Sequence, residues 1–182
     1  MNATRKDICT AYIALYRREE EGSVPTSFHW ALCYLPRDFN DDTTKGFYVY
    51  QVLDESGIWE QSRVDHNPIR VEHIQRFHIV IKLGDISTDI NTVSEFTASQ
   101  PATQDDTPIL ETHKKWSCAL WIIRVLSDLQ EAELFSDIPL YTEADKVKFY
   151  RRIYSIGALA SGDPDSDYPI YHRGMVKMTQ YK

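Results

Sequence analysis

The sequence predicts a single α+β domain in which an antiparallel β-sheet packs against helices. Three observations lead to this prediction. Short stretches of aromatic and β-branched residues, separated by turn residues, fill the first half of the chain. An amphipathic helical pattern begins after Pro108, and neither a repeat nor a linker divides the sequence. The 182 residues are enough to bury a sizeable core, so we treat residues 1–182 as one domain.

Five segments have the composition and alternation of strands: 8–16, 27–36, 46–53, 58–64 and 77–83. The third and fourth are joined by the tight turn Asp-Glu-Ser-Gly and predict a hairpin. In the second segment, SFHWALCYLP, alternation places His29 and Cys33 on one face and the large aromatic residues on the other. A histidine here either packs in the core or serves a chemical group elsewhere.

The next segment, residues 85–107, is rich in Ser, Thr, Asp and Gln, and predicts a long surface connection. A helix then follows, because apolar residues recur at spacings of three and four from Trp116 to Leu129 and Ser117 is suited to cap it. A second helix is indicated after Thr142-Glu143-Ala144-Asp145, an approximate capping box. From Gly157 to Tyr171 we expect an irregular tail.

Composition argues against several classes of protein. The net charge of -7 disfavours nucleic acid as a partner, because such binding depends on clustered Lys and Arg. The sequence lacks an apolar stretch long enough for a membrane span, and no secretory signal is apparent at its start, so we expect a cytoplasmic protein. Three cysteines without a close pair predict neither a disulfide framework nor a zinc cluster.

The histidines do not predict a metal site either. His66, His73 and His78 lie within thirteen residues, but their spacing fits no common ligand motif. We therefore expect neither a metal nor a cofactor.

One constellation has the residue types of a thiol enzyme. Cys118 follows the expected cap Ser117, so its sulfur lies at a helix start, where free backbone N–H groups and the helix dipole lower a thiol pKa. Such a nucleophile needs a base, and His29 on its strand is our candidate. Gln51 interrupts an apolar strand and is our first choice to orient His29, with Asp54 as the second.

Structural explanations compete with each of these assignments. Cys118 could be a small packed residue of the helix, and His29 a core histidine. His113, five residues before the cysteine, is a rival base or a solvated side chain beside two lysines. Cys9 and Cys33, in the middle of strands, are expected to be core residues.

The sequence resembles a group of short fungal proteins of unassigned function that share a strand beginning His-Trp, a hairpin, and a helix opening with Cys near Trp. These landmarks correspond here to His29-Trp30, residues 48–68 and residues 116–121, and the resemblance covers residues 8–135. A histidine strand followed by a cysteine helix is similar to the circularly permuted papain-like fold of lecithin:retinol acyltransferase and its relatives. That resemblance implies a strand histidine that activates a helix-start cysteine for acyl transfer or hydrolysis.

The chain departs from that family at two positions. Ser117 stands where the permuted acyltransferases usually have Asn, and Gln51 where they have a second histidine or another polar residue. Gln51 can orient His29 but brings no negative charge to stabilise an imidazolium. The membrane-anchoring helix of the acyltransferase also has no counterpart.

Together these observations predict a cysteine-dependent hydrolase or acyltransferase acting on a small amide, ester or thioester. Cys118 attacks the carbonyl, His29 transfers the proton, Gln51 orients His29, and the Cys118 N–H contributes to the oxyanion hole. The alternative is a non-catalytic ligand-binding or assembly protein that keeps the fold. This alternative is supported by the departures at Ser117 and Gln51 and by the 12% aromatic content. The expected partner is a small-molecule or acyl substrate, and a homo-oligomer is left open.

Overall fold

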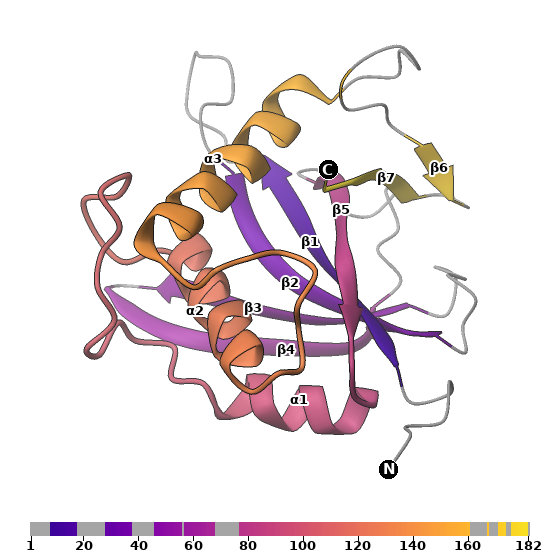
Figure 1. Cartoon of the computed structure of the whole chain (residues 1–182), viewed down its shortest axis with the longest axis horizontal. Coiled ribbons are helices and arrows are strands. Elements are labelled where there is room, and N and C mark those ends of the chain that lie inside the picture. The colour runs from indigo at the N-terminus through magenta and orange to yellow at the C-terminus, as the bar shows by residue number, and fades with distance from the viewer. Residues whose placement is uncertain are drawn as a thin grey trace.

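The strands form one mixed sheet with the order β4-β3-β2-β1-β5-β7-β6 (Figure 1). This computed structural model describes residues 8–17, 28–37, 46–55, 57–67, 77–160, 167, 171–173 and 176–181. The strands are β1 (Cys9–Arg17), β2 (Phe28–Pro36), β3 (Phe47–Glu55), β4 (Ile58–Asn67), β5 (Phe77–Ile86), β6 (Tyr171–Arg173) and β7 (Val176–Gln180). The helices are α1 (Ile90–Ser99), α2 (Cys118–Glu131) and α3 (Glu143–Leu159).

The predicted α+β class is confirmed, and so are the first five strands and both predicted helices. The sheet is mixed rather than antiparallel throughout, because β7 pairs with β5 in parallel. Antiparallel pairing holds from β4 through to β5 and between β6 and β7.

Both predicted helix starts are formed by the side chains that the sequence indicated. The Ser117 hydroxyl accepts a hydrogen bond from the Leu120 N–H at 3.3 Å and caps α2. At the start of α3, Thr142 and Asp145 form a reciprocal capping box. Each cap satisfies N–H groups that have no partner inside the helix.

Two segments were predicted wrongly. Residues 85–107 contain α1, which begins because the Asp89 carboxylate accepts hydrogen bonds from the N–H groups of Asn91 and Thr92. The residues that α1 buries are Val93, Ser94 and Thr97, so two of the three give no apolar signal in the sequence. Residues 157–159 were also expected to be irregular, but α3 continues to Leu159. Residues 161–166 and 168–170 of the expected tail lie outside the described residues.

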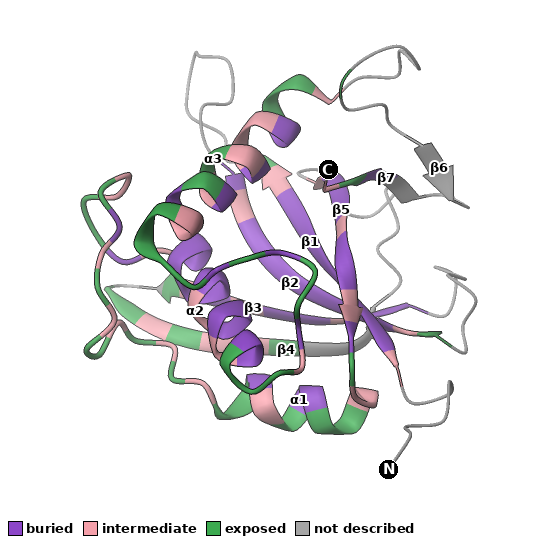
Figure 2. Ribbon diagram, in the orientation of Figure 1, coloured by how far each residue is buried: buried purple, intermediate pink, exposed green. Residues whose placement is uncertain are grey.

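Alternating side chains of the sheet belong to two apolar clusters. The residues of β2 that face the helices, Trp30 and Leu32 among them, form a core with α1, α2 and α3. Ala31 and Cys33 point the other way, into a smaller cluster that includes Tyr12. The central strands and α2 are accordingly the most buried elements of the chain (Figure 2).

Candidate active site

His29 and Gln51 come together across the space between β2 and β3. The His29 Nε2 lies 2.8 Å from the Gln51 Oε1, and both residues are half-buried. Asp54, the second choice for this role, is exposed near the end of β3. The structure therefore brings His29 together with the residue that the sequence placed first.

Cys118 is the first residue of α2, and its sulfur reaches the backbone of β2. The Trp30 N–H donates a hydrogen bond to the Cys118 Sγ, with a nitrogen–sulfur distance of 3.4 Å. Only 2% of Cys118 is exposed. The sulfur thus lies beneath the surface, next to the peptide that joins His29 to Trp30.

The two side chains start from opposite faces of the sheet. His29 alternates with Trp30, whose ring stacks on Tyr150 of α3, and the His29 ring lies 6.0 Å from that of Tyr16 on the other face. Cys118 belongs to the core on the helix side. An intact sheet at this point would separate the thiol from the imidazole.

The sheet is open where these residues meet. Pairing between β2 and β3 covers Leu32–Tyr34 of β2, whereas the β1 ladder covers the whole of β2. Strand N–H groups point in the plane of the sheet, and β1 occupies one edge of β2. The Cys118 sulfur therefore approaches Trp30 from the other edge, in the space that β3 has left, as the diverging strands in Figure 1 illustrate.

This arrangement limits the separation of Cys118 and His29. Two bonds join the Trp30 nitrogen to the His29 Cα, so the sulfur lies within about 6 Å of that Cα. The two predicted partners, 89 positions apart in the sequence, are neighbours in the fold.

A cavity of about 620 Å³ lies beside His29 and is called the His29 cavity below. Its lining residues come from β2, the β3–β4 hairpin and the segment before α2: His29, Val52, Leu53, Asp54, Trp59, Thr112, His113, Lys114, Lys115, Trp116 and Ser117. Ser117 forms the part of the wall next to Cys118 in the chain. The cavity thus reaches the start of α2 but ends one residue short of the thiol.

His113, the rival base, lines the same cavity from the helix side. Its Nδ1 lies 2.9 Å from the Thr112 hydroxyl oxygen, and its ring packs edge-on against Tyr150 at 4.4 Å. Burial lowers the pKa of His113, which favours the neutral imidazole. The pKa of Tyr150 is raised, mainly by burial and then by the charges of Tyr154 and Cys118, so this phenol stays protonated near neutral pH.

Cys9 and Cys33 are core residues, as predicted. They are 1% and 0% exposed, and burial raises the pKa of each thiol to about 12. All three cysteines are thiols that form no disulfide. Cys9 and Cys33 remain protonated at neutral pH and are poor nucleophiles.

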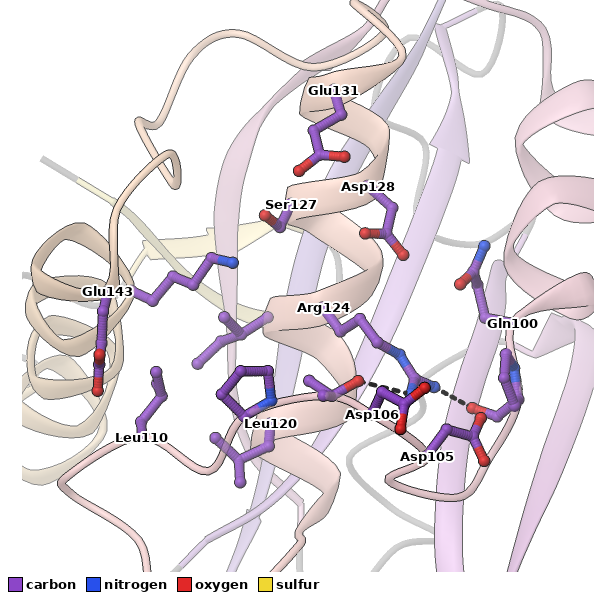
Figure 3. A pocket seen from close by; sticks show the side chains of 15 residues that line it. Gln100, Asp105, Asp106, Leu110, Leu120, Arg124, Ser127, Asp128, Glu131 and Glu143 are labelled. Atoms are coloured by element: carbon purple, nitrogen blue, oxygen red, sulfur yellow. Dashed lines mark hydrogen bonds between the residues drawn. The ribbon is translucent and has the colours of Figure 1, made fainter.

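A second cavity, of about 470 Å³, lies between α2 and the segment from Gln100 to Leu110 (Figure 3). Arg124 crosses it and donates hydrogen bonds to the carbonyl oxygens of Pro101, Thr103 and Gln104. Its guanidinium also lies over the Trp116 ring, 5.0 Å from the centroid. Arg124 therefore holds this segment against α2, and we assign it a structural role.

The sequence did not reveal two parts of the site. The first is the Trp30 N–H, a backbone donor that any residue type at this position would supply. The sequence also does not show where the pairing between β2 and β3 ends. Trp59 lies on β4 and lines the His29 cavity, but the alternation of its strand does not distinguish it from a packing residue. Lys114 and Lys115, which precede α2, were the one feature of the sequence that could have indicated this cavity.

No three His, Cys, Asp or Glu side chains within the described part of the chain are grouped so that they could hold a metal ion. The His66 side chain and all of His73 lie outside the described residues. His78 is on β5, with its Nε2 2.6 Å from the Gly157 carbonyl oxygen. In the described ranges, every helix is too short or too polar to cross a membrane.

Comparison with known protein families gives a match that covers most of the chain. Residues 10–143 match a family described as "Family of unknown function (DUF6914)", and this range contains His29, Gln51 and Cys118. No curated protein and no solved structure matches the chain. The resemblance to a permuted papain-like fold therefore stays a prediction.

Proposed function

The chain belongs to the DUF6914 family, whose function is unknown, and we propose from its own residues that it is a cysteine-dependent hydrolase or acyltransferase for small amides, esters or thioesters. The observation that carries this proposal is the convergence of three residues at the opening between β2 and β3. There the His29 imidazole meets Gln51, and the Cys118 sulfur meets the adjoining Trp30 peptide.

The hydrogen bond to Gln51 assigns the proton on His29. The Gln51 Oε1 is an amide oxygen and only accepts, so the His29 Nε2 carries the hydrogen and donates it. The lone pair of the neutral ring is then on Nδ1, the nitrogen nearer to the backbone. Because the Cys118 sulfur lies close to the His29 backbone, Nδ1 is the nitrogen suited to take the thiol proton.

Two features of the Cys118 site favour the thiolate. The Trp30 N–H already donates to the sulfur, and such a hydrogen bond strengthens when the acceptor carries a negative charge. The sulfur also lies at the start of a fourteen-residue helix whose first turn has no acidic residue. The positive end of the helix dipole is therefore not offset by a carboxylate in that turn.

The reaction follows from these positions. The His29 Nδ1 takes the thiol proton as the Cys118 sulfur bonds to the carbonyl carbon, and the carbonyl oxygen becomes an oxyanion. When the tetrahedral intermediate collapses, the bond to the leaving nitrogen, oxygen or sulfur breaks, and His29 returns the proton to that atom. Water or an acceptor hydroxyl, amine or thiol then gives a proton to His29 and bonds to the acyl carbon. The bond from that carbon to the Cys118 sulfur breaks, the acyl group leaves on the acceptor, and His29 returns the proton to Cys118.

The Cys118 N–H is the first donor proposed for the oxyanion. Cys118 is the first residue of α2, so its N–H lies at the N-terminal end of the helix, where the dipole is positive. A donor in this position stabilises the charge that develops during attack.

A second candidate function is a binding protein that has no chemistry at this site. The burial of Cys118 favours it, since only 2% of the residue is exposed and the His29 cavity ends at Ser117. Buried thiols are ordinarily inert. The two candidates differ in whether a small reagent reaches Cys118 in the folded protein.

Native-state labelling with iodoacetamide tests the proposal. We expect Cys118 to react below about pH 8.5, the ordinary range for a thiol, while Cys9 and Cys33 stay unmodified as internal controls. In a panel of ester and thioester substrates, Cys118→Ala and His29→Ala should abolish turnover, and Cys33→Ala should not. A Cys118 that is unlabelled in the native state, together with no turnover, contradicts the enzyme proposal and supports the binding protein.

We also propose a reducing compartment, the cytoplasm, for this activity. The reduced thiols of Cys9, Cys33 and Cys118 support this location, because disulfides persist mainly in oxidising compartments. The proposed partner is a small acyl substrate.

A further inference from the structure

We infer that the His29 cavity binds substrates through an anionic group, a carboxylate or a phosphate, carried on the small acyl compound. This inference rests on the proposed function, because it names the substrate class of the same site. It is carried by the placement of charge in the cavity and around the start of α2.

The cavity has a positive lining in a chain that is negative overall. Lys114 and Lys115 line it and are exposed at its rim, whereas Asp54 is the single carboxylate among its described lining residues. The whole chain carries a formal charge of -7. The local charge at this cavity is therefore opposite in sign to the net charge of the chain, so anions are attracted to this part of the surface.

The cavity around Arg124 provides the contrast within the same protein. Five carboxylate residues line it against two basic ones: Asp105, Asp106, Asp128, Glu131 and Glu143 against Arg124 and Lys146 (Figure 3). The Arg124 guanidinium already donates hydrogen bonds to carbonyl oxygens of the neighbouring segment. An anion would be repelled there, so the His29 cavity is where an acidic ligand is expected.

The α2 helix adds to the effect of the lysines. Ser117, its N-cap, lines the cavity, so the positive end of the helix dipole is at the cavity wall. No acidic residue of the first turn offsets it, unlike α3, whose first turn contains Glu143 and Asp145.

The rest of the lining suits the carbon part of a short acyl compound. Trp59 contributes aromatic surface and Leu53 contributes aliphatic surface, and both side chains are half-buried. A ligand with a few methylene groups and a terminal anion matches this combination, because apolar walls bind the chain while a few charged groups fix its orientation.

The matched reagents iodoacetate and iodoacetamide test the charge preference at Cys118 without requiring turnover. Both alkylate a thiolate with loss of iodide, but only iodoacetate is an anion. We expect the ratio of their rate constants, iodoacetate over iodoacetamide, to be about three- to tenfold higher at Cys118 than for free N-acetylcysteine. The preference should fall as NaCl is raised to about 0.5 M, because exposed lysines are screened by salt.

The double variant Lys114→Gln/Lys115→Gln should return this ratio to the value of the free thiol. The matched control Lys146→Gln/Lys148→Gln removes the same two charges from α3, away from the cavity lining, and should leave the ratio high. A ratio equal to that of the free thiol in the wild type, or equal losses in both double variants, overturns the inference.

Equilibrium binding separates this inference from the proposed function and identifies the anion. Succinate and inorganic phosphate are titrated into the wild-type chain and into both double variants, with tryptophan fluorescence as the readout. Binding of either anion that is lost with Lys114 and Lys115 supports the inference even if Cys118 proves unreactive. If neither anion binds while Cys118 still reacts and turns over neutral thioesters, the proposed function stands and the anion site is wrong.

Discussion

The side chains of His29 and Gln51 bridge two strands that have already separated, with a 2.8 Å hydrogen bond between Nε2 and Oε1. Pairing of β2 with β3 ends at Leu32, three residues from His29. The bond therefore holds the imidazole beyond the end of the β2–β3 ladder, which makes Gln51 a positioning residue.

Gln51→Leu should impair the reaction more than it impairs substrate binding. Loss of the Oε1 acceptor frees the His29 tautomer and ring orientation, so we expect kcat to fall about ten- to hundredfold with KM little changed. The ¹⁵N chemical shifts of the His29 ring should move toward a mixture of tautomers. Gln51→Glu keeps an acceptor and should retain the Nε2–H tautomer. Unchanged shifts in the leucine variant would rule out the positioning role.

Cys118→Ala should destabilise the fold more than Cys118→Ser. Alanine leaves the buried Trp30 N–H without its sulfur acceptor, and an unsatisfied buried donor costs about 1–3 kcal/mol. Serine retains an acceptor at the same position on the helix, so its loss should be smaller. Urea unfolding of the three chains measures the difference, and equal losses would show that the hydrogen bond contributes nothing.

Gly157→Ala should lower stability although alanine is the better helix former. An added Cβ would lie 2.7 Å from the Leu15 Cδ1 and 2.9 Å from the Phe28 Cε2, in the buried contact of α3 with the sheet. Overpacking costs about 1–3 kcal/mol, against a helix gain of about 1 kcal/mol. Lys148→Ala, at an exposed position of α3, is the control and should change stability by less than about 0.5 kcal/mol. An increase in Tm for Gly157→Ala would contradict the packing.

Asp89→Asn should remove a pH-dependent contribution to stability. Hydrogen bonds from the Thr92 side chain, from the Thr92 N–H and from the Asn91 N–H lower the pKa of Asp89 below its usual 3.8. The ionised cap therefore stabilises the fold above the unfolded pKa, and this contribution is lost as pH falls through the lower folded value. The urea midpoint of unfolding should be higher for the wild type than for Asp89→Asn at pH 6, and this difference should decrease toward pH 3. A constant difference would exclude the linkage.

The sequence was sufficient for the elements with strong local patterns. The alternation of β2, the apolar spacing of α2 and the caps Ser117 and Thr142 all appear in the structure as predicted. The helix α1 was missed because its buried face includes Ser94 and Thr97, which contribute little apolar periodicity. The parallel partner β7 could not be foreseen, since pairing between distant strands leaves no local trace.

The same difference between local and non-local information applies to the candidate site. The residue types of His29, Gln51 and Cys118 could be read from the sequence, and so could the helix start that carries the cysteine. The separation of β2 from β3 could not, because it depends on where the pairing of two strands stops, which is on the N-terminal side of Leu32. Without that separation the thiol and the imidazole would lie on opposite faces of a closed sheet.

The hydrogen bond from Trp30 to Cys118 also connects two steps of folding. A strand amide is normally protected from hydrogen exchange by a hydrogen bond to the adjacent strand. The Trp30 amide is instead bonded to the side chain of Cys118, 88 residues later in the chain. The Trp30 amide can be protected only after α2 has docked on the sheet. Its hydrogen-exchange rate is therefore a single-residue reporter of helix docking, and it would signal local undocking of α2 even while the ladder between β1 and β2 stays closed.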